Sequence, residues 1–259
     1  MKKIYFLSDA HLGSRASADN RGREQRLCRF LDSIRHEASA IYLLGDIFDF
    51  WFEYHNVIPK GYTRFLGKLS ELSDAGIEIH FFTGNHDMWA FDYLHEECGV
   101  ILHTAPMEIS LPSLSGNPLT AFVGHGDGLG DPDKKFRFLR GMFHSPLLQW
   151  MFAGIHPRWS VNFGLEWAKH SRLKHEREGA PHYMGEQNEP LITYSKEYLK
   201  QHPDINYFIY GHRHIELDLM LTRDARLLIL GEWIDLCTYA VFDGDTLRME
   251  NFIEGETQP

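Results

Sequence analysis

Residues 41–49 read IYLLGDIFD, a short apolar run followed at once by a glycine and two acidic residues. A run of this length that is apolar throughout is typical of a strand covered on both faces. Gly45 permits a sharp turn as the chain leaves that strand. The same order returns at 207–214, YFIYGHRH, where Gly211 again separates an apolar run from a polar cluster. These stretches predict a layered fold with polar groups at the ends of its strands.

Other parts of the chain extend this pattern. Apolar runs rich in β-branched and aromatic residues also occur at 4–7, 77–83, 121–123 and 227–230. Apolar residues at helical spacing predict two amphipathic helices, at 27–34 and 65–72, and the proline-rich stretch 104–118 reads as a β-turn-β connection. Strands alternating with helices, then strands alone, predict an α/β fold of two packed β-sheets flanked by helices. We expect a single domain spanning 1–259.

The composition narrows the class of protein. Hydrophobic residues make up 43% and charged residues 24% of the chain, which is ordinary for a globular domain. The three cysteines are widely spaced and form no CxxC pair, which favours free thiols in a reducing cytoplasm. No run reaches the roughly 18 apolar residues of a membrane-spanning helix. The net charge of -10 argues against a general nucleic-acid binder.

One region departs from the acidic average. Between Lys134 and Arg177 there are nine Lys and Arg against two acids, a balance of +7 that leaves -17 for the rest of the chain. The surrounding stretch 131–185 is also rich in Phe, Trp and Leu and interrupts the rhythm of the strands. It predicts a helical insertion, either an ordinary packed subdomain or a cap over the active site.

Five polar motifs each follow an apolar run, and they carry the chemistry: Asp9-Ala10-His11, GDIFD at 45–49, GNHD at 84–87, GHGD at 124–127 and GHRH at 211–214. The carboxyl ends of strands are where α/β sheets place their ligand sites. Residues two apart lie on one face of an extended segment, so Asp9 and His11 can reach the same pocket. One such motif alone is a weak signal, but five in order predict a single site.

The donor set indicates metal ions. Carboxylate, amide and imidazole groups suit Mn²⁺, Fe²⁺ or Zn²⁺. Seven ligands would overfill one ion but suit two ions about 3.5–4 Å apart that share a bridging carboxylate. The predicted ligands are Asp9, His11, Asp46, Asn85, His125, His212 and His214.

This ordered series of motifs resembles the calcineurin-like metallophosphoesterase superfamily. The resemblance implies that Asp9, His11, Asp46 and His214 hold one ion, that Asp46, Asn85, His125 and His212 hold the other, and that Asp46 bridges them. It also implies that His86 acts beside the phosphate, as leaving-group acid or transition-state stabiliser, and that Asp87 orients it. Asp49 and Asp127 either orient a ligand or the metal-bound water, or are simply solvated loop residues.

The substrate is indicated by a longer resemblance. GDIFDFW at 45–51, HGDGLGDPD at 125–133 and the basic aromatic insertion together resemble the UDP-2,3-diacylglucosamine hydrolases of lipid A biosynthesis, which are peripheral membrane proteins. That family implies hydrolysis of a lipid-linked nucleotide sugar to UMP and 2,3-diacylglucosamine 1-phosphate, usually with Mn²⁺, at the inner face of the cytoplasmic membrane. The candidate substrate contacts, each of which could also be a solvated helix position, are Asp133, Arg140, Lys169, Ser171 and Arg172.

One position departs from that family. Its best-known members carry Arg where this chain has His86, so the motif takes the general GNHD form of the superfamily. A paralogous phosphodiesterase or pyrophosphatase acting on another amphiphilic or nucleotide substrate is therefore an alternative. A non-catalytic scaffold on the same fold is a second alternative, although such a protein would be expected to have lost ligands.

Overall fold

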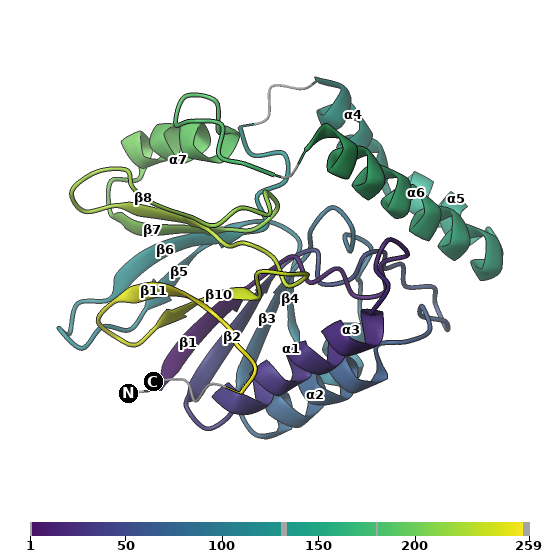
Figure 1. Ribbon diagram of the computed structural model, residues 1–259, viewed down its shortest axis with the longest axis horizontal. Helices are drawn as coiled ribbons and strands as arrows, with labels where there is room; N and C mark the ends of the chain where they lie inside the picture. The colour runs from purple at the N-terminus through teal and green to yellow at the C-terminus, as the bar shows by residue number, and fades with distance from the viewer. Residues whose placement is uncertain (1, 131–133, 180, 256–259) are drawn as a thin grey trace.

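The computed structural model describes residues 2–130, 134–179 and 181–255 and consists of two stacked sheets with helices on their outer faces (Figure 1). The first sheet has six strands in the order β11-β10-β1-β2-β3-β4. The strands β1 to β4 are parallel, and β10 and β11 add an antiparallel edge. Their bounds are β1 Lys3–Leu7, β2 Ala38–Leu44, β3 Glu78–Phe82, β4 Ile101–His103, β10 Thr238–Phe242 and β11 Leu247–Asn251.

The second sheet has five strands in the order β5-β6-β7-β9-β8. Its central strands β6, β7 and β9 run parallel, while β5 and β8 pair antiparallel at the two edges. Their bounds are β5 Met107–Leu111, β6 Leu119–Gly124, β7 Ile205–Tyr210, β8 Leu217–Met220 and β9 Arg226–Ile229.

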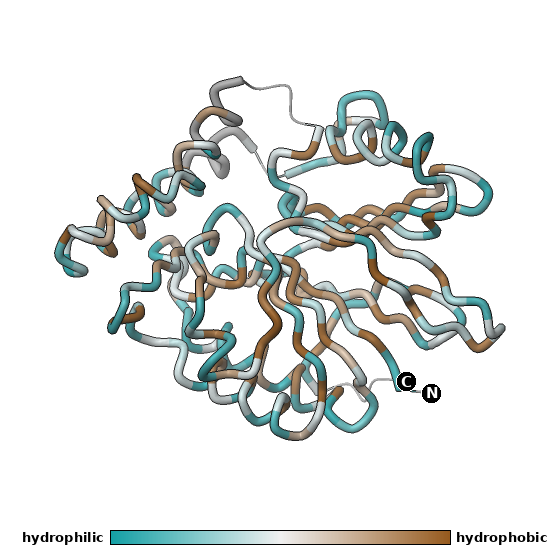
Figure 2. Tube along the Cα trace, turned by 180° about the vertical axis from the view of Figure 1, so that it is seen from behind, coloured by the Kyte–Doolittle hydropathy of each residue, from teal (hydrophilic) through white to brown (hydrophobic). Residues whose placement is uncertain are grey.

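The apolar core lies in three layers. Between the sheets, buried side chains such as Phe6 and Leu44 pack against Val123 and Ile209. The helices α1 (Asn20–Ile34) and α2 (Thr63–Asp74) cover the outer face of the first sheet, with α3 (Tyr93–Cys98) beside them. Helix α7 (Pro190–Gln201) covers the outer face of the second sheet. The hydropathy colouring shows the apolar residues concentrated along the inner strands (Figure 2). The predicted fold of two packed sheets flanked by helices is confirmed.

Every predicted strand and both predicted helices are present, and 104–118 contains β5 and the turn that leads into its antiparallel partner β6. The sequence did not predict β4, β8, β10, β11, α3 or α7. Several of these are short or lie at sheet edges, where one face is exposed and the apolar run is broken. In β8, for example, half-buried and exposed residues alternate.

The region predicted as a helical insertion contains three helices, α4 (Lys134–Phe143), α5 (Pro146–Ala153) and α6 (Pro157–Glu178). Helix α6 rests on the body through small residues four apart, Ser160, Gly164 and Ala168, all of which are buried. A side chain at Gly164 would run into the ring of Phe50. We call α4 to α6 the helical arm.

The other side of α6 carries large apolar side chains that face outward. Trp159, Phe163 and Trp167 are 69%, 60% and 53% exposed, and brown segments mark the arm in Figure 2. Within the described residues, no helix combines the length and apolar character needed to cross a membrane.

Candidate metal centre

The five polar motifs meet where β1, β2, β3, β6 and β7 end. Asp9 and His11 follow β1, Asp46 follows β2, and Asn85 follows β3 in the first sheet. His125 follows β6, and His212 and His214 follow β7 in the second sheet. Because the two sheets are stacked, these strand ends lie at one edge of the sandwich. The structure brings all seven predicted ligands into one cluster.

The backbone of the cluster is strained. Asp9, His11, Asp46, His212 and His214 have φ between 44° and 68°, the left-handed region that residues other than glycine rarely adopt. Each such residue costs on the order of 1–3 kcal/mol and persists only where its surroundings enforce it. Hydrogen bonds between loops do so here: the Asp9 N–H donates to the Gly45 carbonyl at 3.0 Å and the His11 N–H to the Asp46 carbonyl at 2.9 Å. Such concentrated strain is typical of a functional site.

The motif glycines allow the loops to approach closely. A Cβ at Gly45 would lie 2.7 Å from His125 Nδ1, and one at Gly211 would lie 2.5 Å from Asp9 Oδ2. Any larger residue at either position would push a candidate ligand out of the cluster. Gly45 also has a φ of 83°, which agrees with the sharp turn expected after the strand.

Asp46 occupies the middle of the cluster. Its Oδ2 lies 3.8 Å from His11 Nε2 on one side and 3.4 Å from His125 Nε2 on the other. Its Oδ1 accepts a hydrogen bond from the His86 N–H at 2.8 Å, which fixes the orientation of the carboxylate. One oxygen is thus aimed between two groups of ligands, as a bridging carboxylate requires.

The remaining ligands divide between the two sides of Asp46. On one side, His214 Nε2 lies 3.2 Å from both Asp9 Oδ1 and His11 Nε2. On the other side, Asn85 Oδ1 lies 3.3 Å from His125 Nε2, and the rings of His125 and His212 are 5.1 Å apart. Three sets can each present ligand atoms within 4.8 Å of one another: Asp9, His11 and His214; His11, Asp46 and His86; and Asp9, Asp46 and His125.

A buried oxygen tests whether these residues fit metal ions. Asp9 is fully buried, and its Oδ1 has no hydrogen-bond partner among the described residues although it faces two imidazoles. A buried carboxylate is costly unless a positive charge compensates it. A cation held between Asp9, His11 and His214 would supply that charge, so the donor set fits a metal.

The electrostatics of the cluster agree with this fit. Burial would raise the pKa of Asp46, but the charges of His125 and His86 hold it below its usual range. Burial would lower the pKa of His125, but the Asp46 carboxylate raises it well above the ordinary value. Burial and the neighbouring charge of His125 lower the pKa of His212 to about 4. The raised pKa of His125 reflects the negative potential of the neighbouring carboxylates, a potential that also favours a cation.

His86 and Asp87 do not contact each other as predicted. The Asp87 carboxylate instead accepts backbone N–H groups of Gly84 at 2.7 Å and Ile47 at 2.8 Å, and so ties the second and third loops together. Burial and the charge of Asp46 raise the pKa of Asp87 to about 7. The His86 ring is held by the Asp49 carbonyl, 2.8 Å from Nδ1. Among the described residues no hydrogen bond joins the Asp87 carboxylate to the His86 ring, so the orientation of His86 by Asp87 stays a prediction.

Asp49 connects the cluster to the helical arm. Its Oδ1 lies 3.3 Å from His11 Nδ1 and accepts a hydrogen bond from Arg172 Nη2 of α6 at 3.0 Å. Asp49 is fully buried and the Arg172 side chain is 16% exposed. Of the two roles left open for Asp49, this geometry favours orientation of a ligand.

The predicted substrate contacts lie in different settings. Arg172 is engaged by Asp49, and Arg140 Nε donates to Asp127 Oδ2 at 2.6 Å. Lys169 and Ser171 are half-buried on α6, near Arg172 in sequence. Asp133 lies outside the described residues.

The sequence analysis missed one supporting residue. Glu189 is buried, and its carboxylate accepts from Arg213 Nε at 3.0 Å and Nη2 at 3.1 Å. Because Arg213 lies between His212 and His214, this bidentate ion pair fixes the last motif against the start of α7. A signal was available, since an arginine flanked by two predicted ligands needs a carboxylate partner.

Carboxylate, amide and imidazole donors gathered at the strand ends of a two-sheet sandwich are typical of metal-dependent phosphoester hydrolases. Residues 2–216 match the family described as calcineurin-like phosphoesterase, and the chain belongs to that family.

Relatives extend over nearly the whole chain. The UDP-2,3-diacylglucosamine hydrolase of Porphyromonas gingivalis is 44% identical over 98% of this chain and 99% of its own length. The enzyme of the same name from Edwardsiella ictaluri is 30% identical over 88% of this chain and 83% of its own. Among solved structures, a dimetal phosphatase from Danio rerio is similar over 96% of this chain and 95% of its own, at 13% identity and a TM-score of 0.46.

Proposed function

We propose that the protein hydrolyses the pyrophosphate of UDP-2,3-diacylglucosamine to UMP and 2,3-diacylglucosamine 1-phosphate. The observation that carries this proposal is the 44% identity to an enzyme of that name over almost the full length of both chains. The aligned stretch covers 98% of this chain and so includes the helical arm as well as the ligand loops. The arm is the part expected to distinguish one phosphoesterase substrate from another.

The metal assignment follows the division around Asp46. Asp9, His11, Asp46 and His214 would hold one divalent cation, and Asp46, Asn85, His125 and His212 the other. Mn²⁺ is the proposed metal, with Fe²⁺ and Zn²⁺ as alternatives that the same donors accept. Two bound cations would polarise the phosphoryl oxygens and make a water molecule nucleophilic at neutral pH.

His86 is proposed to act on the phosphate itself. A carbonyl oxygen only accepts hydrogen bonds, so the contact with Asp49 requires the proton of a neutral ring to sit on Nδ1. The His86 Nε2 then faces the cluster, 3.9 Å from Asp46 Oδ2. Donation to a leaving group or a phosphoryl oxygen therefore requires the doubly protonated ring, whether His86 acts as an acid or as a stabiliser of charge.

The helical arm is proposed as a cap, an insertion at 131–185 within a single domain of 1–259, that contacts the inner face of the cytoplasmic membrane. The supporting observations are the exposed side chains of Trp159, Phe163 and Trp167 and the +7 balance of 134–177. Apolar side chains that enter an interface beside basic ones are typical of peripheral attachment to anionic lipid. Lys169 and Ser171, on the same helix, remain proposed substrate contacts.

The proposal is tested with purified protein, Mn²⁺ and UDP-2,3-diacylglucosamine, with products identified by mass spectrometry. UMP and the diacylated sugar phosphate should appear together. UDP-N-acetylglucosamine, which has the same pyrophosphate but lacks the second acyl chain and the long chains, serves as the matched control and should react far more slowly. Turnover of soluble diesters alone would favour the paralogous phosphodiesterase, and no turnover of any ester would favour the scaffold.

A further inference from the structure

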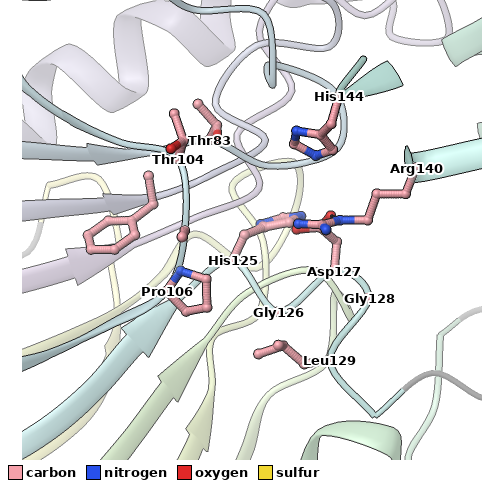
Figure 3. A pocket seen from close by; sticks show the side chains of 12 residues that line it. Thr83, Thr104, Pro106, His125, Gly126, Asp127, Gly128, Leu129, Arg140 and His144 are labelled. Atoms are coloured by element: carbon pink, nitrogen blue, oxygen red, sulfur yellow. Dashed lines mark hydrogen bonds and ion pairs between the residues drawn. The ribbon is translucent and has the colours of Figure 1, made fainter. Parts of the chain in front are cut away.

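A cavity of about 290 Å³ opens beside the metal cluster, on the side of the second sheet. One wall is the turn 125–129 after β6, and the other is formed by the end of β3 and the loop before β5 (Figure 3). The candidate ligand His125 contributes to this wall. Any group bound in the cavity is therefore next to a phosphate at the metals.

The cavity is lined by hydroxyl and carboxylate groups that can make further hydrogen bonds. The hydroxyls of Thr83 and Thr104 line it, and neither makes a hydrogen bond to another described residue. Asp127 accepts from Arg140 through Oδ2, and its Oδ1 has no hydrogen-bond partner among the residues that the structure describes. Pro106 and Leu129 supply apolar surface in the same cavity (Figure 3). This combination suits a flat heterocycle joined to a sugar that carries hydroxyl groups.

Arg140 forms the side of the cavity nearest the arm. Gly128, with a φ of 74°, leaves room for its side chain, and a Cβ there would lie 3.1 Å from Arg140 Cδ. The pair with Asp127 fixes Nε and leaves the two terminal nitrogens without a described partner. A guanidinium in this position can pair with the phosphate that follows a nucleoside.

The apolar side chains that could contact acyl chains lie outside this cavity, at the helical arm. Phe50, Phe52 and Trp89 form a separate buried cluster with Phe152 beneath the arm, and the exposed aromatic residues project from α6. A substrate with acyl chains at one end and a nucleoside at the other can satisfy both regions with its pyrophosphate at the metals. The acyl chains would lie at the arm, and the nucleoside would lie on the His125 side.

We propose that this cavity binds the nucleoside half of the substrate, a pyrimidine ribonucleoside. The base lies against Pro106 and Leu129, Thr83 and Thr104 bond its edge or the ribose, and Asp127 accepts from a ribose hydroxyl. Arg140 pairs with the adjoining phosphate. The volume is near the lower end of ligand sites, roughly 300 Å³, which suits one nucleoside and excludes a diacylated sugar. This inference rests on the proposed function, because the nucleoside belongs to that substrate.

The test removes hydroxyls without changing shape. Thr83→Val and Thr104→Val, singly and together, are compared with Thr63→Val, which alters an exposed threonine on α2. The Kd of UMP for the metal-loaded protein is measured by calorimetry, and UMP and 2,3-diacylglucosamine 1-phosphate are each tested as product inhibitors. The double variant should bind UMP about 10-fold more weakly or worse, with KM rising more than kcat falls. Its inhibition by the lipid product should match that of Thr63→Val.

Two outcomes overturn the inference. One is an unchanged Kd for UMP in the double variant; the other is weaker inhibition by the lipid product with UMP inhibition intact. Ala105→Leu adds bulk to the cavity wall without removing a polar group. It is an independent test of the cavity and should also weaken the binding of UMP. If the wild-type protein fails to hydrolyse UDP-2,3-diacylglucosamine, the proposed function falls, and the UMP titration alone decides whether the cavity binds a nucleoside.

Discussion

The ligand loops and the helical arm depart from the usual pattern of burial in opposite ways. In the loops, polar side chains such as Asp9 and Asp46 are buried and held by strained backbone. In the arm, apolar side chains such as Trp159 and Phe163 are exposed on regular helix. Each is costly for a folded protein by itself. The difference fits the two kinds of partner proposed above, cations for the loops and an apolar surface for the arm.

The largest effect is expected in the loops. His125→Ala removes a proposed ligand next to the proposed bridge Asp46, and activity should fall by about two to three orders of magnitude, as when transition-state charge loses its stabilising group. Bound Mn²⁺, measured by elemental mass spectrometry, should fall with it. His36→Ala, an exposed histidine on the body, should leave both unchanged. Full activity in His125→Ala would contradict the metal assignment.

A smaller effect is expected where loops and arm join. Arg172→Gln leaves Asp49 without its cationic partner and so loosens His11. Changes of this kind next to a metal ligand cost roughly 10–100-fold in metal affinity or activity. Metal affinity should be measured directly, by competition with a fluorescent chelator.

A matched control for Arg172→Gln is available at another contact between the arm and the body. Arg15 is exposed and bonds Glu166 on the exposed side of α6, so Arg15→Gln removes an arm contact that does not reach the cluster. If Arg15→Gln and Arg172→Gln weaken metal binding equally, Arg172 acts only by seating the arm, and the link through Asp49 to His11 is wrong.

The arm itself should show an effect on lipid surfaces. Replacing Trp159, Phe163 and Trp167 together by Ser should reduce binding to vesicles containing anionic lipid by about 10-fold or more, because each ring loses apolar burial. Sedimentation with vesicles measures the bound fraction. Triple replacement of Val57, Leu114 and Ile253, which are exposed on the body, is the control. Equal losses in both triples would remove the case for a specific membrane face.

Sequence predicted the ligand cluster well because each ligand is set by its own strand end. The position of Asp9 relative to β1, or of His125 relative to β6, depends on a few neighbouring residues. By contrast, Arg172 finds Asp49 across 123 residues, and His86 is held by a carbonyl that carries no side-chain signal. Such contacts depend on tertiary packing, and residue type alone does not specify them.

The faces of α6 illustrate the same limit. Trp159, Phe163 and Trp167 are large apolar residues, yet they face outward. The buried side is formed by Ser160, Gly164 and Ala168, whose small size allows close approach. Hydropathy alone favours the aromatic face for packing, while the i, i+4 spacing of small residues marks the true contact.

The smallest predicted effect lies in that contact. The Tyr54 hydroxyl bonds Ser160 Oγ, joining the loop after β2 to α6. Tyr54→Phe keeps the ring and removes only the hydroxyl, so the free energy of unfolding should fall by about 1 kcal/mol. Chemical denaturation of Tyr54→Phe, Ser160→Ala and the double variant measures the coupling between the two side chains. Since the bond lies outside the ligand cluster, Mn²⁺ affinity should not change; a loss of metal binding as large as that of Arg172→Gln would mean that the arm and loops form one cooperative unit.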